Sequence, residues 1–328
     1  MQKRVLSGIR ATGRLHLGNY LGAVKGMLEL QSDPNYETFY MVADLHAITT
    51  PYDPKTLASN TREVIIDYLA IGIDPEKSTI FIQSQIPEHT ELSYLFSTAV
   101  TVARMQHLPT FKEKVKQHPE NVSMALLYYP VLMAADILIY KASLVPVGVD
   151  QEPHLEVSRE IAGKLNERFK LDFPEPQRFA TKGEYIPSLV GEGKMSKSVE
   201  GSFINLNDDL ETIKKRLAAA PTDSGQGESV PSKGGVATLL KFVELFQGAG
   251  KCAEYEKAYT GDGIRYGDLK NGLAQAIFEE LTPIQEKRKE LEANPEYVDK
   301  VITEGAQKAR QVASQTLQEV KTAMGLGR

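Results

Sequence analysis

Apolar residues in the first half of the chain follow two patterns that alternate along the sequence. Short continuous apolar runs, bounded by turn residues, predict β-strands at residues 5–9, 38–43, 79–83 and 144–147. Longer runs, in which apolar residues recur at helical spacing, predict helices at residues 17–30, 54–72, 88–103, 125–140 and 151–169. Strands that alternate with helices favour an α/β fold, in which helices cover both faces of a doubly wound parallel sheet.

Two of these helices carry capping signals. Asp53 precedes Pro54, and a capping residue followed by proline is typical of a helix amino terminus. Gly72 marks the expected end of the same helix. Asp150 is expected to cap the helix that runs to about Phe169. Both helices are therefore predicted to start directly after an aspartate.

The second half of the chain is almost wholly helical from about residue 208. Amphipathic runs lie at residues 210–217, 236–246, 269–291 and 298–324. Residues 170–202, rich in proline, glycine and charge, are expected to form a connector with mobile loops, and residues 222–235 a flexible loop. We therefore divide the chain into an α/β domain, a mobile loop and an all-helical region, at residues 1–190, 191–202 and 203–328.

Composition and charge narrow the class of protein. A chain of 328 residues favours two domains, and a hydrophobic fraction of 41% supplies enough apolar material for a sizeable core. The net charge of −5 argues against a protein that coats nucleic acid, so DNA is not an expected partner, although a local basic face stays open. The single cysteine, Cys252, excludes an internal disulfide framework and a cysteine-based metal cluster. No apolar run is long enough to span a bilayer, so no membrane association is expected and the cytoplasm is the expected location.

The first candidate site follows the first predicted strand, where residues 13–20 read GRLHLGNY. A helix that begins here would direct unpaired backbone N–H groups at a phosphate group. Gly18 would let a flat ligand lie against the backbone, and His16 and Asn19 would donate hydrogen bonds to phosphate oxygens. For this string alone, a purely structural turn is the alternative.

The second candidate site is the glycine-flanked string KMSKS at residues 194–198. Lys194 and Lys197 could close over a polyphosphate and neutralise the charge that develops on a departing pyrophosphate. A solvated basic loop is the alternative. Because the two strings together are far rarer than either alone, their joint presence favours a nucleotide site.

A third candidate site is the helix that reads YYPVLMAADIL at residues 128–138. It places one carboxylate, Asp136, in an apolar wall, where a charge is unfavourable unless it is paired or hydrogen-bonded. Tyr129, Met133 and Asp136 share one face of this helix. One acceptor among apolar walls suits a large aromatic ligand with a single donor, such as an indole N–H. A structural salt bridge or a helix cap is the alternative.

The first two strings resemble the signature motifs of class I aminoacyl-tRNA synthetases, whose catalytic domain is a Rossmann-like doubly wound sheet. The first motif of that family usually ends in histidine, and Asn19 at this position implies a hydrogen-bonding amide instead of a titrating group. The helix that carries Asp136 and the string VPVGVDQEPH at residues 145–154 resemble the tryptophan branch of the family, and tyrosine enzymes usually carry Gln in place of Met133. The resemblance covers nearly the whole chain, including residues 304–310.

The resemblance implies a tryptophan pocket around the helix that carries Asp136. Tyr129 and Gln151 would hold the amino group of the substrate, and His46 would lie near its carboxylate. Val145 and Val147 would line the ring pocket. The full set of tryptophan-binding residues implied in this way is Leu6, His46, Tyr129, Met133, Asp136, Val145, Val147 and Gln151.

The resemblance also implies residues that bind ATP and catalyse its reaction. Lys194, Lys197 and Lys114 are the implied catalytic residues, because their charges would offset the charge of the leaving pyrophosphate. Arg10 and Thr110 depart from the residues most common at their positions. The full ATP-binding set is Arg10, His16, Gly18, Asn19, Gly148, Ile186, Lys194, Met195, Ser196 and Lys197.

The implied activity is the attachment of L-tryptophan to tRNA(Trp) in two steps, through an adenylate that forms from ATP with Mg²⁺. The substrate carboxylate is already ionised, so positioning and charge stabilisation suffice without a general base. No protein-ligated metal, prosthetic group or editing domain is expected. The resemblance further implies a homodimer with residues of about 104–140 at the interface, and anticodon contact by the helical region, where basic clusters lie at residues 214–216 and 287–289.

Three other functions stay open on the sequence. A tyrosine-specific enzyme of the same family would show tyrosine-dependent exchange of pyrophosphate into ATP. A nucleotidyl transferase that builds a dinucleotide cofactor would share the phosphate-binding turn but would not charge tRNA. A catalytically idle relative that only binds RNA or proteins would form no adenylate.

Overall fold

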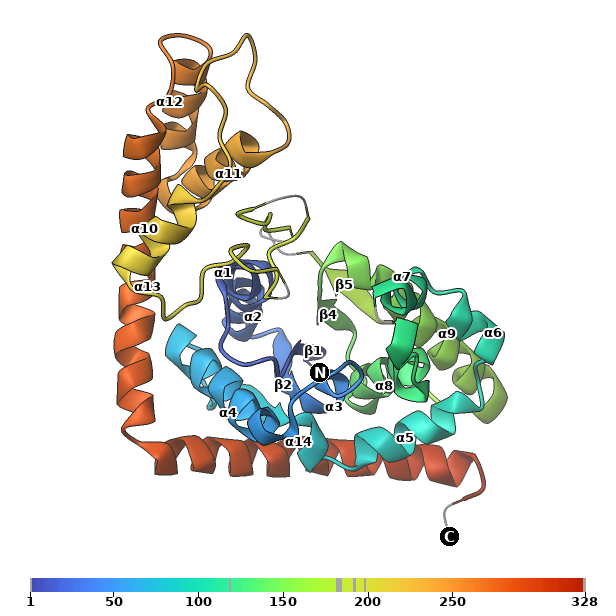
Figure 1. Cartoon of the computed structure of the whole chain (residues 1–328). Coiled ribbons are helices and arrows are strands. Elements are labelled where there is room, and N and C mark those ends of the chain that lie inside the picture. Colours follow the sequence, from blue (N-terminus) through green and yellow to red (C-terminus); the bar gives the residue numbers. More distant parts are fainter. Residues whose placement is uncertain (1, 118, 181–184, 191–192, 198, 327–328) are drawn as a thin grey trace. The chain divides into compact units, whose positions relative to one another are not determined.

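A five-stranded parallel sheet lies in the larger of two compact units (Figure 1). The computed structural model describes residues 2–117, 119–180, 185–190, 193–197 and 199–326. The strands are β1 (Lys3–Arg10), β2 (Tyr36–Ala43), β3 (Ser78–Ile82), β4 (Leu144–Pro146) and β5 (Gln177–Phe179). Their order across the sheet is β3-β2-β1-β4-β5, and all neighbouring pairs are parallel. The order reverses between β1 and β4, and open α/β sheets bind ligands beyond the carboxyl ends of the strands at such a switch point.

The four predicted strands are confirmed. The last six residues of β2 are buried one after another, as expected for a strand that is covered on both faces of the sheet. The fifth strand, β5, lies in the segment that is expected to be a connector. It has three residues, begins with an exposed glutamine and pairs only with β4, so it lacks the apolar run that marks a buried strand.

Helices and short 3₁₀ turns join these strands. The larger unit contains α2 (Lys25–Gln31), α3 (Asp44–Ala47), α4 (Pro54–Ile71), η2 (Gln83–Gln85), α5 (Glu88–Ser97), α6 (Val102–Gln106), α7 (Pro109–Gln117), η3 (Pro119–Asn121), α8 (Met124–Ile139), η4 (Val149–Gln151), α9 (Glu152–Phe169) and α14 (Pro295–Ala323). Asp53 caps α4 by accepting a hydrogen bond of 2.9 Å from the backbone N–H of Lys55, and Gly72 ends the helix in a left-handed conformation. The capping predictions for this helix are confirmed.

Two other helix predictions are wrong in detail. Asp150 does not cap α9, because Val149–Gln151 form a 3₁₀ turn and α9 begins at Glu152. The single helix expected at residues 88–103 is two helices. The side chain of Thr101 accepts a hydrogen bond of 3.2 Å from the backbone N–H of Arg104 and so begins α6.

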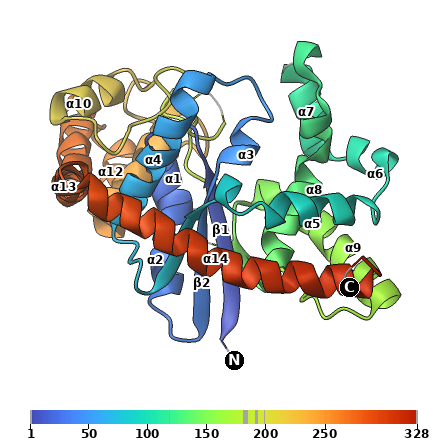
Figure 2. The same ribbon diagram turned by 90° about the horizontal axis from the view of Figure 1, so that it is seen from below.

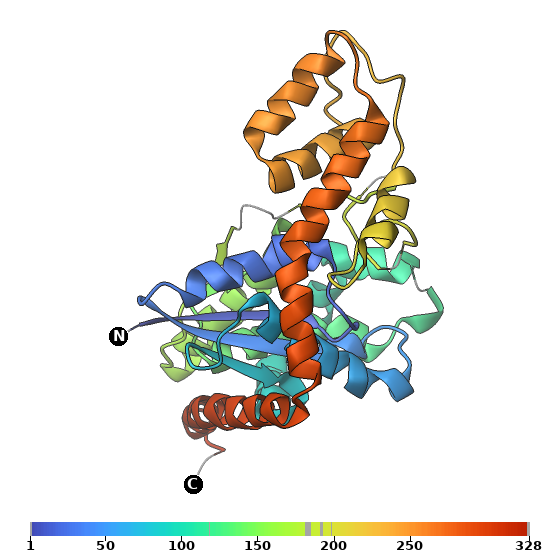
Figure 3. The ribbon, with the colours of Figure 1, turned by 90° about the vertical axis from the view of Figure 1, so that its left-hand side faces the viewer.

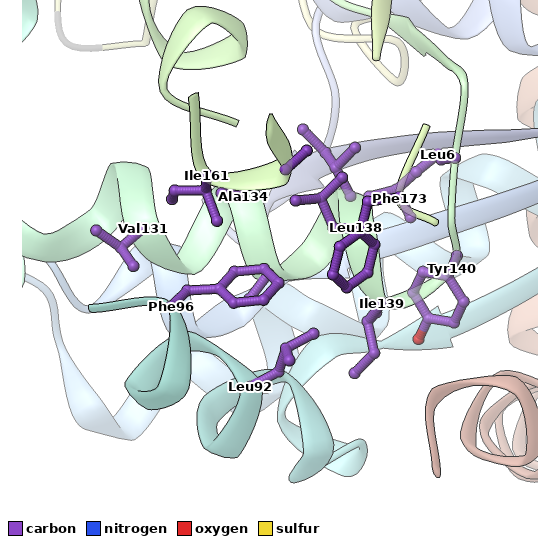
Figure 4. Close-up of a cluster of buried hydrophobic side chains, with 14 of the residues drawn as sticks. Leu6, Leu92, Phe96, Val131, Ala134, Leu138, Ile139, Tyr140, Ile161 and Phe173 are labelled. Atoms are coloured by element: carbon purple, nitrogen blue, oxygen red, sulfur yellow. The ribbon is translucent and has the colours of Figure 1, made fainter. Parts of the chain in front are cut away.

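The core of the larger unit forms around α8 (Figure 4). Its side chains Val131, Ala134 and Leu138 are fully buried among residues of α5 and α9. Phe96 of α5 meets Phe173 edge-on, with ring centroids 5.7 Å apart. This packing holds α8 in place and makes it a rigid support for the candidate residues that it carries.

The long C-terminal helix α14 packs against β3, α5 and α8 of the larger unit (Figure 2). At Gly305 the helix comes so close to the strand that a β-carbon would lie 1.7 Å from the carbonyl oxygen of Ile80. Further along, Arg310 forms an ion pair with Glu88 at 2.9 Å. Only a glycine allows this approach of helix to strand.

The boundaries of the two compact units differ from the boundaries that the sequence predicts at residues 190 and 203. The larger unit comprises Met1–Gly13, Ala23–Glu184 and Leu291–Arg328, and the smaller comprises Arg14–Gly22 and Tyr185–Glu290. The segment Arg14–Gly22 belongs to the smaller unit because its backbone bonds to residues 204 and 205, and α14 belongs to the larger unit because it packs on β3. Both differences come from contacts between segments far apart in the sequence.

The smaller unit is mainly helical (Figure 3). Its regular elements include α1 (Leu17–Asn19), α10 (Leu210–Ala218), α11 (Gly235–Gln247), α12 (Ala249–Tyr259) and most of α13 (Tyr266–Glu292). The helix predicted at residues 17–30 exists, but Tyr20–Val24 form a π-helical turn within it. Helix α12 is absent from the sequence prediction. In the described part of the chain, no helix is both long and apolar enough to cross a membrane.

The loop between α10 and α11 is attached to the helices around it. The carboxylate of Asp223 accepts hydrogen bonds from the hydroxyls of Tyr259 (2.5 Å) and Tyr266 (2.6 Å), and the backbone of Gly225 bonds to that of Ile264. Residues 222–234 have no regular secondary structure, and these bonds attach the first part of the predicted flexible loop to the helices around it.

Candidate active site

Several predicted residues lie at the carboxyl ends of the strands in the larger unit. Arg10 is the last residue of β1, His46 lies in α3 directly after β2, and Gly148 follows β4. This is the edge of a parallel sheet where ligands bind. Helix α8 adds Tyr129, Met133 and Asp136, as the sequence predicts.

Asp136 lies at the centre of a buried hydrogen-bond network. Its Oδ1 accepts hydrogen bonds from Gln83 Nε2 (2.8 Å) and His89 Nδ1 (2.6 Å), and its Oδ2 accepts from His46 Nε2 (2.7 Å) and Gln83 Nε2 (3.0 Å). Burial by itself would raise the pKa of Asp136, but the hydrogen bonds and charges of His46 and His89 outweigh burial and bring the pKa to about 2. The side chain is therefore an ionised carboxylate, which only accepts hydrogen bonds.

The two histidines of this network differ in their surroundings. The Nε2 atom of His89 lies 2.7 Å from the hydroxyl of Tyr140. The ionised carboxylate of Asp136 only accepts, so His89 donates to it from Nδ1. The His89 side chain is 0% exposed, whereas that of His46 is 12% exposed. His46 is therefore the donor that can leave Asp136 with the least disturbance.

Sequence reasoning found Asp136 but missed Gln83 and His89. Both lie shortly after β3, and a polar residue directly after a buried strand was the available signal. His46 was expected near the substrate carboxylate. In the structure the His46 ring is hydrogen-bonded to Asp136. It also meets the Tyr129 ring edge-on, and the centroids of these two rings are 6.3 Å apart. Asp136 thus hydrogen-bonds to protein side chains, which the alternative of a structural salt bridge includes.

A second network surrounds Tyr129. The hydroxyl of Tyr129 lies 2.6 Å from His154 Nε2, and the His154 Nδ1 atom lies 2.9 Å from Gln151 Oε1. Thr110, at the start of α7, also reaches His154 Nε2, at 2.7 Å. Burial lowers the pKa of His154 to about 4, against a smaller opposing effect of the Asp150 charge, so this histidine is neutral near pH 7. The structure thus brings Tyr129 and Gln151 together through His154, which the sequence analysis did not select.

The apolar residues predicted for the ring pocket fall into two groups. Leu6 and Val145 are buried in the main core, with exposures of 3% and 2%. Met133 and Val147 are partly buried and pack against the same core. The second pair is therefore better placed to touch a ligand than the first.

Arg10 and Lys114 form a positively charged part of the larger unit. Arg10 donates a hydrogen bond of 2.9 Å to the Thr50 hydroxyl, while its Nε is buried without a partner. Burial lowers the pKa of Lys114, and the nearby positive charge of Arg10 lowers it further, with a smaller opposing effect of Glu113. Two cations with an unsatisfied donor favour an anionic ligand.

The two strings that are predicted to bind phosphate meet in the smaller unit. The sulfur of Met195 accepts a hydrogen bond of 3.2 Å from the backbone N–H of Gly18, and Lys197 Nζ donates to the carbonyl of Arg14. A β-carbon on Gly18 would lie 2.8 Å from the His16 ring, so glycine is needed at this position. Two segments that are far apart in the sequence are thus in direct contact.

His16 and Asn19 of the first string hydrogen-bond to each other, and the His16 ring is neutral near pH 7. His16 precedes α1, and its backbone N–H donates a hydrogen bond of 3.2 Å to Asn19 Oδ1, so the amide NH₂ of Asn19 points elsewhere. Burial and the charges of Lys197 and Lys194 lower the pKa of His16 to about 4, so its ring is neutral near pH 7. The Nδ1 atom of that ring is buried without a partner. An unused amide donor and a neutral imidazole next to two lysines suit a phosphate ligand.

Other predicted residues of the lysine loop support its backbone. Ile186 is fully buried, and its carbonyl accepts a hydrogen bond of 2.9 Å from the backbone N–H of Met195. The backbone N–H of Ser196 donates to the Ser202 hydroxyl at 3.4 Å. Ser198, the last residue of the predicted string, lies outside the described residues.

The basic clusters of the helical region are largely engaged with the protein itself. Lys214 pairs with Glu211 at 2.8 Å, Lys287 pairs with Glu290 at 2.8 Å, and Arg288 is only 4% exposed. These clusters therefore offer less free positive charge than their sequence indicates. Among the described residues, no group of three or more potential ligands is placed to hold a metal ion.

A parallel sheet with a switch point is typical of nucleotide-binding α/β enzymes of the Rossmann type. The chain belongs to the class I tRNA synthetases (W and Y), and the family model matches residues 2–282. The predicted family and fold class are confirmed.

Known proteins match the chain over nearly their whole length, in sequence and in structure. The chain is 41% identical over 327 residues to the tryptophan–tRNA ligase of Porphyromonas gingivalis, with 98% of each chain covered. The crystal structure of tryptophanyl-tRNA synthetase from Mycoplasma pneumoniae has a TM-score of 0.87 and 35% identity, and the match covers 100% of this chain and 99% of that one. The Campylobacter jejuni enzyme, complexed with ADP and tryptophan, has a TM-score of 0.84 and 32% identity, over 98% of this chain and 100% of that one.

Proposed function

We propose that this protein attaches L-tryptophan to tRNA(Trp) in two ATP-dependent steps, the activity of a tryptophan–tRNA ligase. The observation that carries the choice of amino acid is the ionised carboxylate of Asp136, held on the same face of α8 as Met133 and Tyr129. The full-length relatives are named tryptophan–tRNA ligases, which supports tryptophan over tyrosine as the substrate of this chain.

Asp136 accepts the indole N–H in this proposal. Its Oδ2 already accepts a hydrogen bond from His46, so tryptophan exchanges one donor for another and the buried charge stays satisfied. The displaced His46 is then available near the substrate carboxylate. Leu6, Met133, Val145 and Val147 form the apolar wall, with the exposed parts of Met133 and Val147 nearest the ring.

The amino group of the substrate binds to Tyr129 and Gln151. In the first step a carboxylate oxygen of tryptophan attacks the α-phosphorus of ATP. The new bond joins that oxygen to phosphorus, and the bond from phosphorus to the bridging oxygen breaks, so pyrophosphate leaves with the electron pair. No proton moves, and the protein contributes orientation and positive charge.

His16, Gly18 and Asn19 seat the nucleotide, while Lys194 and Lys197 offset the charge of the pyrophosphate. Gly148, Ile186, Met195 and Ser196 complete the nucleotide site through their backbone. Arg10 and Lys114 add positive charge for the phosphates, in keeping with their shared electrostatic environment. Mg²⁺ enters with ATP, bound to the phosphate oxygens.

In the second step the terminal adenosine hydroxyl of tRNA attacks the adenylate carbonyl, and AMP leaves. The helical region 203–328 is the proposed site of anticodon contact.

We also propose that the chain acts in the cytoplasm, where tRNA and ATP are available, and as a homodimer. Exposed large apolar side chains at residues 94–124 support the homodimer, because such side chains mark protein–protein contact surfaces. The most exposed are Tyr94 (72%), Val102 (59%) and Met124 (72%).

Fluorescence titration with free tryptophan tests the proposal directly. The chain contains no tryptophan, so selective indole excitation reports only the ligand. We expect saturable binding that tyrosine does not compete away, and exchange of pyrophosphate into ATP that depends on tryptophan. Exchange that depends on tyrosine instead would overturn the choice of amino acid.

A further inference from the structure

Four side chains next to the proposed amino-group site form a continuous line of hydrogen bonds. Gln151 Nε2 lies 2.7 Å from Asp150 Oδ2, Gln151 Oε1 lies 2.9 Å from His154 Nδ1, and His154 Nε2 lies 2.6 Å from the Tyr129 hydroxyl. The proposed function uses Tyr129 and Gln151. It assigns nothing to His154 or Asp150.

The carboxylate at one end fixes the direction of every bond in this line. A carboxylate only accepts, so Gln151 must turn its NH₂ group to Asp150 and its oxygen to His154. His154 Nδ1 must then carry the ring proton and donate it to that oxygen. Since His154 is neutral, its Nε2 has a lone pair and takes the proton of the Tyr129 hydroxyl.

The burial of His154 supports this order. The side chain is 1% exposed, and burial holds its pKa at about 4, so a second ring proton is absent near pH 7. Thr110 also reaches Nε2, at 2.7 Å, but a hydroxyl next to an unprotonated nitrogen can only donate to it. Nε2 has one lone pair, and the phenol of Tyr129, at 2.6 Å, is both closer and more acidic than the Thr110 hydroxyl, so Tyr129 is the donor that Nε2 accepts.

We propose that His154 is a positioning residue, oriented by Asp150 through Gln151, which makes Tyr129 and Gln151 accept hydrogen bonds from the α-ammonium group of the substrate. The inference rests on the proposed function, because it concerns the same amino-acid site. With its proton engaged by His154, Tyr129 presents only oxygen lone pairs. Gln151 keeps the second lone pair of its oxygen. An ammonium group, which only donates, requires two such acceptors.

Removal of the Asp150 charge removes the constraint. An amide at position 150 can donate as well as accept, so the Gln151 amide can rotate and His154 can adopt its other tautomer. In that arrangement His154 Nε2–H donates to Tyr129, and the phenol proton turns toward the substrate ammonium. Two donors then face each other, and the affinity for the amino group falls.

The test compares tryptophan with indole-3-propionate, which has the ring and the carboxylate but no amino group. Both ligands contain indole, so fluorescence titration reports both dissociation constants in a chain without tryptophan. We expect Asp150→Asn to weaken tryptophan binding by about tenfold, the effect of one impaired charge-assisted hydrogen bond. Binding of indole-3-propionate should change by less than about twofold.

Matched variants separate this effect from simple loss of charge. Glu156→Gln removes an exposed carboxylate from α9, the helix that follows Asp150. Glu156 pairs only with Arg159 in the described contacts, so this variant should leave both constants unchanged. Asp150→Glu keeps the anion and should restore most of the affinity. Asp150→Asn should also have a smaller effect in a Tyr129→Phe background, because the phenol through which it acts is then absent.

The outcomes distinguish this inference from the proposed function. If the unaltered protein does not bind tryptophan, the proposed function is wrong. If it binds tryptophan but Asp150→Asn leaves that affinity intact, or weakens both ligands equally, the positioning role is wrong. An equal effect of Glu156→Gln would also overturn it, because charge alone would then explain the loss.

Discussion

The close approach of α14 to β3 predicts that one small substitution, Gly305→Ala, destabilises the protein. A β-carbon at this position would lie 1.7 Å from the carbonyl oxygen of Ile80 and 2.8 Å from its carbonyl carbon. The obstacle is the backbone of a strand, which cannot rotate away as a side chain can. Helix or strand must shift, and strain of this kind costs about 3 kcal/mol. Alanine favours a helix by about 1 kcal/mol over glycine, so the net loss is about 2 kcal/mol.

Gly163 in α9 provides the matched control, because a β-carbon there would meet nothing within 4 Å. The same substitution at Gly163 should therefore stabilise the protein by up to about 1 kcal/mol. We expect the urea midpoints of the two variants to move in opposite directions from that of the unaltered protein. If the Gly305→Ala variant were as stable as the unaltered protein, the close approach of α14 to β3 would be refuted.

Three further predictions concern the proposed site and its charges. Lys194→Ala should lower the rate of tryptophan-dependent pyrophosphate exchange far more than the affinity for tryptophan, and an unchanged rate would remove the lysine loop from the mechanism. Asn19→Asp should weaken ATP binding in calorimetry and leave tryptophan affinity intact, because the carboxylate still accepts from His16 but repels phosphate; equal ATP affinity would contradict that role. The pKa of Asp136, about 2, is lower than the ordinary value of 3.8 for an aspartate, so the ionised side chain stabilises the fold at pH values above 3.8. About 2 kcal/mol of this stability should disappear as the pH falls from 4 to 2 in urea unfolding, whereas a flat profile would mean that the carboxylate is not ionised there.

The sequence predicts the regular centre of the fold well and its margins poorly. Strands β1 to β4 are found because a parallel sheet covered on both faces needs continuous apolar runs. Strand β5 and helix α12 are missed because neither has a strong apolar period, and their structure depends on neighbours. Asp150 fails as a cap for a related reason: a helix start depends on the backbone of the preceding turn as well as on the residue type.

The candidate site shows the same limit at the level of single residues. Asp136 stands out in the sequence because a charge in an apolar helix requires a partner. Its partners His46, Gln83 and His89 are 90, 53 and 47 residues away in the chain, so only the packed sheet brings them together. His154 is only three residues from Gln151, but its role depends on Tyr129, which is 25 residues away on another helix.

Asp136 already accepts hydrogen bonds from protein side chains, and this changes how much the proposed indole hydrogen bond contributes to affinity and to selectivity. The carboxylate keeps the same number of hydrogen bonds when the indole N–H replaces His46, so the exchange adds little net affinity. Affinity must come mainly from burial of the ring against Met133 and Val147. Selectivity is different: a ligand of the same shape without an N–H would displace His46 and leave an ionised oxygen buried and short of a donor, which is strongly unfavourable. In the proposed function, the network of Asp136 therefore rejects ligands that lack the donor, and the His46 hydrogen bond satisfies the charge before a ligand with the donor binds.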